Sequence, residues 1–159
     1  EIYLVQPNEK YETPNLVKVL EDPNIEIVIH FSRKDKSAIE NFLKPKCKIF
    51  PLFDSKIASR LVRKYSNDHG LSSLCQEFAG VRLEKRMASS DWAKDISVYS
   101  QKEKMYAAAD VQYLYLIKTK LEAMLKREKK FDIFMKCMEF IDTRIEIDNF
   151  GVDKIFDHS

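Results

Sequence analysis

The sequence lacks three features that would each indicate a particular class of protein. No apolar run approaches the roughly 18 residues that a membrane-spanning helix needs, so no membrane association is expected. Neither sign of charge dominates, because 27 basic and 25 acidic residues leave a net charge of +2. Charge alone therefore indicates no nucleic-acid partner. The sequence also contains no internal repeat and no low-complexity linker. These absences leave an ordinary globular protein as the expected class.

Cysteine is scarce as well, with only Cys47, Cys75 and Cys137. An odd number of cysteines at wide spacings fits neither a zinc site nor a disulfide framework. Each of the three lies in an apolar neighbourhood. We therefore expect buried free thiols in a protein of the reducing cytoplasm.

What is present fits one globular domain over residues 1–159. The hydrophobic fraction is 45%, with ten Phe and seven Tyr, which is enough to build an ordinary core. Residues 1–5 carry no charged segment typical of a signal peptide, and the sequence does not begin with Met. Because these residues read as a strand, we expect the sequence to be part of a longer polypeptide.

The first third of the sequence predicts an α/β arrangement. The run at residues 25–30 is β-branched and nearly continuous in apolar character, which is typical of a buried parallel strand. Strands are also expected at residues 2–5 and 47–50, with helices at 15–20 and 33–43. This βαβαβ order predicts a sheet with helices packed against it.

After Pro51 the pattern becomes helical. Apolar residues recur at helical spacing in residues 54–65, 71–78, 111–127 and 131–140, and a helix is expected to start near Gln101. Residues 81–100 read as an irregular loop, and the tail from residue 145 is mixed. Within the helical part, Tyr106 and Asp110 are four residues apart and so share one helix face. A phenol beside a carboxylate suits metal-assisted phosphodiester chemistry, although the spacing alone is a weak signal.

Three patches give this pair its context. They are residues 30–35 (HFSRKD), residues 51–61 (PLFDSKIASRL), and the segment that runs from Gly80 through Ser90-Asp91-Trp92 to Tyr106, Asp110 and Val111. In this order they resemble the ribonuclease D branch of the DEDD exonuclease superfamily, which has Tyr in its last motif. The likeness covers essentially the whole chain and is strongest to short, single-domain bacterial members.

The resemblance implies a ribonuclease H-like 3′–5′ exonuclease fold and a hydrolase that removes nucleotides from RNA 3′ ends, such as those of tRNA precursors, with two Mg²⁺ or Mn²⁺ ions. It implies that Asp35 and Asp110 are metal-binding acids and that Tyr106 orients the attacking water. Carboxylates suit this chemistry because hard divalent cations prefer oxygen ligands and clamp both the attacking and leaving oxygens.

The sequence departs from the family pattern in one respect. The family's first motif, Asp-x-Glu on the first strand, supplies two of four acids, and no Asp-x-Glu precedes Asp35 here. We therefore expect an N-terminally truncated sheet, little or no activity from this chain alone, and self-association through the uncovered sheet. The alternative is a non-catalytic remnant or nucleic-acid-binding scaffold of the same fold.

Other polar residues near the motifs have ordinary structural explanations. Asp54 is expected to cap a helix, His30 to be a structural histidine, and Trp92 to anchor its loop, with base stacking as the lesser alternative. Among the basic residues, Lys56, Arg60, Arg63 and Lys64 recur at helical spacing, and Lys85 and Arg86 follow the glycine motif. We take Lys56, Arg60 and Lys85 as candidate nucleic-acid contacts; a solvated helix face is equally compatible with the first group.

Overall fold

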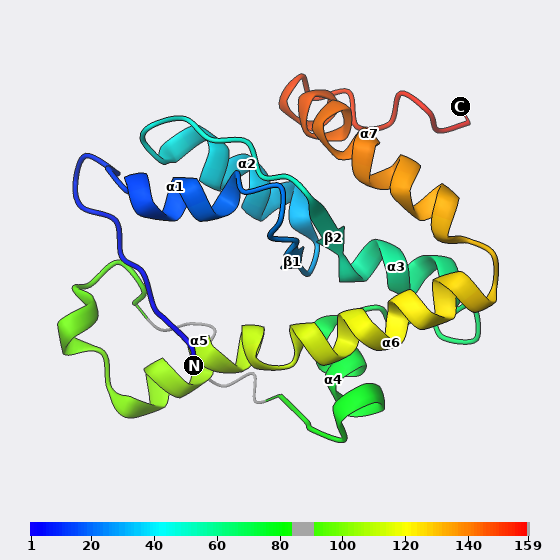
Figure 1. Ribbon diagram of the computed structural model, residues 1–159, viewed down its shortest axis with the longest axis horizontal. Helices are drawn as coiled ribbons and strands as arrows, with labels where there is room; N and C mark the ends of the chain where they lie inside the picture. Colours follow the sequence, from blue (N-terminus) through cyan, green and yellow to red (C-terminus); the bar gives the residue numbers. More distant parts are fainter. Residues whose placement is uncertain (84–90, 159) are drawn as a thin grey trace.

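A two-stranded parallel sheet lies at the centre of the computed structural model, which describes residues 1–83 and 91–158 (Figure 1). Strands β1 (Ile27–Ile29) and β2 (Leu52–Asp54) pair in the register Ile27 to Leu52, Val28 to Phe53 and Ile29 to Asp54. The helices are α1 (Pro14–Leu20), α2 (Ser32–Phe42), α3 (Ser55–Val62), α4 (Leu71–Ala79), α5 (Gln101–Gln112), α6 (Leu114–Arg127) and α7 (Phe131–Asn149), with a 3-10 turn η1 (Ile96–Val98). The predicted α/β class, with a sheet followed by a mostly helical C-terminal half, is confirmed, although the sheet is shorter than predicted.

The core lies where α6 packs on the sheet and on its neighbouring helices. Helix α6 contacts α3, α4 and β1, while α7 contacts α2, α3 and β2. The face of α6 turned to the core carries Leu114, Ile117, Leu121 and Leu125, which are all buried. Their spacing of three or four residues is that of one helix face. This face therefore ties α3, α4 and the sheet into one hydrophobic cluster.

Two of the predicted strands do not form. Residues 2–5 are extended but pair with no strand in the described part of the chain, and most of their side chains are exposed. Residues 47–50 are irregular although Cys47 and Ile49 are buried, because their amides bond elsewhere: Lys48 N donates to Glu21 Oε1 (3.0 Å) and Ile49 N to Glu40 Oε1 (2.7 Å). The second strand starts only at Leu52, after Pro51.

The helices are closer to prediction than the strands. Tyr106 and Asp110 both lie in α5, and that helix starts at Gln101 as expected. The helix expected at residues 111–127 is interrupted at Tyr113, so that α5 and α6 meet end to end there. Helix α7 continues to Asn149, beyond the predicted end. No helix among the described residues is both long and apolar enough to cross a membrane.

The three thiols behave as the sequence predicts. Cys47 and Cys75 are buried, Cys137 is half-buried, and all three are free. Burial raises the pKa of each thiol above its ordinary value. They are therefore packing residues and poor nucleophiles.

Candidate active site

The helix that carries Tyr106 and Asp110 has a strongly defined beginning. Ser100 Oγ accepts a hydrogen bond from Glu103 N (3.2 Å), and Glu103 Oε2 accepts one from Ser100 N (2.8 Å), which together form a capping box. Lys94 Nζ lies 2.6 Å from Glu103 Oε1. The hydrogen bond from Lys94, with those from Ser100, lowers the pKa of Glu103 to about 2. The cap therefore stays ionised and fixes the start of α5.

Tyr106 and Asp110 line one shallow pocket of about 320 Å³ together with Trp92 and Ala107. The rings of Trp92 and Tyr106 are stacked with centroids 5.8 Å apart, and Trp92 also meets Tyr99 edge-on at 5.5 Å. Tyr99 Oη donates to the carbonyl of Trp92 (2.8 Å). These contacts agree with an anchoring role for Trp92, and they place its indole beside the predicted catalytic pair.

Asp110 is exposed to solvent at one side of this pocket and partly desolvated at the other. Partial desolvation raises the pKa of Asp110 above its ordinary value. Cys75 on α4 is close enough that the Asp110 charge adds to the effect of burial in raising the thiol's pKa. A bound cation would favour the ionised form of Asp110 and so lower its pKa again.

Asp35 lies in the first turn of α2, beside the C-terminal end of the sheet. Partial desolvation and then the negative charge of Asp54 raise the pKa of Asp35, against a smaller opposing effect of Lys34. Asp54 is the predicted helix cap: its Oδ1 accepts from the amides of Lys56 (2.8 Å) and Ile57 (3.1 Å). The cap prediction is confirmed.

Asp54 has a second structural role, which the sequence did not reveal: it also binds the first residue of α2. Its Oδ2 accepts from both the amide and the hydroxyl of Ser32, each at 2.7 Å, although 22 residues separate the two. One buried carboxylate therefore joins the beginnings of α2 and α3, and in doing so positions Asp35. No local pattern links residues 32 and 54; only the pairing of β1 with β2 brings them together. Beside them His30 Nδ1 lies 2.9 Å from Ser55 Oγ, in keeping with a structural histidine.

The described residues supply ligands of the right type for a divalent cation but do not complete a site. Asp35 and Asp110 belong to α2 and α5, which are separate in Figure 1. Within residues 1–83 and 91–158, no three His, Cys, Asp or Glu side chains are grouped closely enough to hold one metal ion. Carboxylate oxygens suit Mg²⁺ or Mn²⁺, but Asp35 and Asp110 are not part of any group of three such ligands in the described residues, so no chemical step can be assigned to a metal from them alone.

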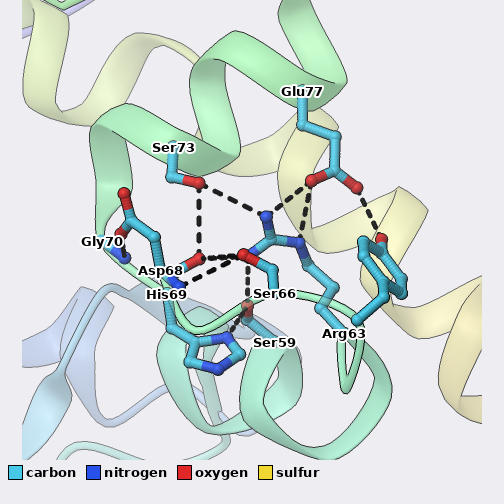
Figure 2. A network of polar contacts seen from close by, with 9 residues as sticks. Ser59, Arg63, Ser66, Asp68, His69, Gly70, Ser73 and Glu77 are labelled. Carbon is cyan, nitrogen blue, oxygen red and sulfur yellow. Dashed lines mark hydrogen bonds and ion pairs between the residues drawn. The ribbon is translucent and has the colours of Figure 1, made fainter.

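The basic residues near the motifs, expected to contact nucleic acid, differ in their exposure to solvent. Arg60 is exposed and Lys56 partly exposed on α3, so both are accessible, and Lys85 lies outside the described residues. Arg63 is not on that surface: its guanidinium is buried and is held by Ser59, Asp68, Ser73 and Glu77, as Figure 2 shows. The expectation that Arg63 belongs to a phosphate-tracking or solvated face is wrong, because its hydrogen bonds to Ser73 and Glu77 hold the side chain against α4 and away from solvent.

Comparison with known proteins confirms the family resemblance. A family model described as 3′–5′ exonuclease matches residues 1–126. Ribonuclease D of Pseudomonas paraeruginosa is 30% identical over 129 residues, which are 80% of this chain and 33% of that protein. The chain thus spans about a third of the length of this curated relative.

Solved structures show the same likeness. Brucella melitensis NrnC bound to pGG superposes with a TM-score of 0.83 and 38% identity, covering 96% of this chain and 73% of that chain. The same protein is also known with bound Mg²⁺ (TM-score 0.82, 37% identity, the same coverage). Escherichia coli RNase D, titled an exoribonuclease involved in structured RNA processing, gives a TM-score of 0.72 at 25% identity over 82% of this chain and 33% of that chain.

Proposed function

The chain belongs to the 3′–5′ exonuclease family, and on that premise we propose that it acts on RNA 3′ ends as an exoribonuclease of the ribonuclease D and NrnC type. The observation that carries the proposal is the pocket of α5, where Tyr106 and Asp110 lie side by side within the residues that the family model matches. Precursor tRNAs, with their 3′ extensions, are the RNA class that we propose first.

Each residue has a proposed role. Asp110, with its raised pKa, is one acid ligand of a divalent cation, Mg²⁺ or Mn²⁺, and Asp35 contributes to a second. Two bound ions would supply charge neutralisation at the scissile phosphate. The Tyr106 hydroxyl positions the water that attacks. Because two of the family's four acids are missing from the sequence, we propose that a polypeptide of residues 1–159 alone has little or no activity.

The test uses a 5′-labelled single-stranded RNA and Mn²⁺. The chain of residues 1–159 alone should leave the RNA intact. A longer polypeptide, which adds the residues encoded upstream of Glu1, should shorten the RNA stepwise from its 3′ end if the added segment contains Asp-x-Glu. In the active form Asp110→Asn should lower the rate at least 100-fold, while Asp132→Asn, an exposed acid in the first turn of α7, should not. Unchanged cleavage by Asp110→Asn would refute the assignment of Asp110.

A second candidate is a nucleic-acid-binding scaffold without catalysis. It is favoured by the incomplete set of metal ligands among the described residues. It predicts salt-sensitive RNA binding and no cleavage by any form of the protein with any divalent metal. Cleavage by the joined polypeptide would exclude it.

We also propose that the chain alone self-associates. In the described part of the chain the sheet has only two strands, so each has an edge without a strand partner, and the apolar side chains of Ile2, Tyr3 and Val5 are exposed as well. Light scattering after gel filtration should show a mass that rises with protein concentration. A monomer at all concentrations would contradict this.

A further inference from the structure

Phe31, between β1 and α2, combines an unusual backbone with an unusual set of neighbours. Its φ of 66° lies in the left-handed region, which is uncommon for a bulky residue and which Gly or Asn adopts at lower cost. Its partly exposed ring is approached by three cations: Lys56 Nζ at 4.1 Å, Arg33 Cζ at 5.0 Å and Lys34 Nζ at 6.0 Å from the ring centroid. Non-glycine residues held in this backbone region cluster at active sites and ligand-binding sites.

Of the three cations around the ring, one is held in an ion pair and two are not. Arg33 pairs with Asp148 on α7, with Nη1 and Oδ2 3.3 Å apart. Lys34 and Lys56 make no ion pair with another described residue. The carboxylate of Asp54 is directed at the amides that begin α2 and α3. Two ammonium groups beside the ring therefore remain available to an anionic ligand.

We propose that Phe31 stacks on one base of a single-stranded RNA, with Lys34 and Lys56 contacting the adjoining phosphate. This inference rests on the proposed function and extends it to a binding residue four positions before Asp35. An aromatic face accepts any base, and cations beside it hold the backbone without reading sequence, which is the usual arrangement in single-strand binding. Gly or Asn at this position would lower the cost of the left-handed backbone but would provide no aromatic ring.

A purely structural role for Phe31 makes a different prediction. In that case the ring would serve only to pack against the Lys56 stem, and any apolar residue of similar size would replace it. Phe31→Leu keeps most of the apolar volume and removes the ring, while Phe31→Trp keeps a ring. Comparing these two variants therefore separates stacking from packing.

The experiment measures binding, not cleavage. Fluorescence anisotropy with a labelled RNA pentamer is recorded in EDTA over a range of salt concentrations, for the wild-type chain and for Phe31→Leu, Phe31→Trp and Lys56→Met. Lys136→Met, an exposed lysine on α7, is the matched control for charge. Pentamers with 2-aminopurine at each position in turn report stacking directly, because an aromatic neighbour quenches the fluorescence of that base. Thermal unfolding confirms that each variant is folded.

We expect Phe31→Leu to weaken binding by about 5-fold or more and to abolish the quenching at one position, while Phe31→Trp retains both. Lys56→Met should reduce the slope of log K against log salt by about 0.7, and Lys136→Met should not. The inference is overturned if Phe31→Leu binds like the wild type, or if Phe31→Trp loses as much as Phe31→Leu. Absence of RNA binding by the wild-type chain would instead refute the proposed action on RNA itself.

Discussion

Replacement of Arg63 by Met is expected to lower the free energy of unfolding by about 3 kcal/mol. The Arg63 side chain is 2% exposed, and each of its five N–H groups has an acceptor. Nε and Nη2 donate to Glu77 Oε2 at 3.0 and 2.5 Å, Nη1 to Ser59 Oγ (3.0 Å) and the Asp68 carbonyl (2.7 Å), and Nη2 to Ser73 Oγ (3.3 Å). The cluster joins the end of α3 to α4 (Figure 2).

The magnitude follows from what Arg63 leaves behind. Ser59 Oγ keeps a contact of 2.9 Å with His69 Nδ1, and Glu77 keeps the hydrogen bond from Tyr65 (2.6 Å) and is one-third exposed. These two acceptors of Arg63 hydrogen bonds therefore keep another hydrogen-bond partner when Arg63 is replaced. The main loss is that of the two charge-assisted hydrogen bonds to Glu77, at roughly 1.5 kcal/mol each. The loss of the neutral hydrogen bonds adds little, because their acceptors keep other partners.

Glu77→Gln removes the other partner of the pair and leaves the buried guanidinium without a counter-charge. We expect a cost of about 3 kcal/mol or more for this variant as well. The double variant should cost less than the sum of the two, by about 1–3 kcal/mol, because the pair acts as a unit. Arg60→Met, on the exposed side of α3, should stay within about 0.5 kcal/mol of the wild type.

Urea unfolding followed by circular dichroism at 222 nm measures these differences. With an m-value of roughly 2 kcal/mol/M, a loss of about 3 kcal/mol moves the midpoint down by about 1.5 M. Desolvation raises the pKa of Glu77, but the hydrogen bonds from Arg63 and Tyr65 outweigh it and the net shift is downward. The stability that the Arg63–Glu77 pair contributes is therefore fully present above 4.5, the pKa of Glu77 in the unfolded chain, and it is lost as the pH falls through the lower pKa of Glu77 in the folded protein. A cost below about 1 kcal/mol for Arg63→Met, or strict additivity, would refute the reasoning.

Three further predictions concern stability. Ser100→Ala removes the cap of α5 and should cost about 1 kcal/mol in urea unfolding, with Ser100→Asp largely restoring it. Ile117→Ala, in the fully buried face of α6, should cost about 2–5 kcal/mol, whereas Leu116→Ala on the exposed face should cost far less; equal costs would contradict the core described here. Burial, with a smaller contribution from Lys56, outweighs the charge of Asp54 and lowers the pKa of His30 to about 4. Because the unfolded chain binds the proton first, stability should fall as the pH drops from 6.5 toward 4, and His30→Gln should flatten that dependence.

The sequence predicted the helices better than the sheet. Helix α5 and its start at Gln101 follow from local signals, a run of alanines and a serine three residues before a glutamate, which act within one turn. The break at Tyr113 carries no such signal. The strand expected at residues 47–50 failed because the side chains of Glu21, just after α1, and of Glu40 in α2 accept hydrogen bonds from the amides that a strand would use. Such competition is between residues far apart in the chain, and no local pattern reports it.

The sequence by itself determined the family, the cap formed by Asp54 and the shared helix face of Tyr106 and Asp110, because motif order and helical spacing are properties of the chain. Only the tertiary structure decided which charges face solvent and which are buried. Arg63 and Lys56 look alike in the sequence, yet one is enclosed by α4 and the other lies against Phe31. The reason is physical: burial depends on which helix the fold places opposite a residue, and that neighbour is not encoded nearby.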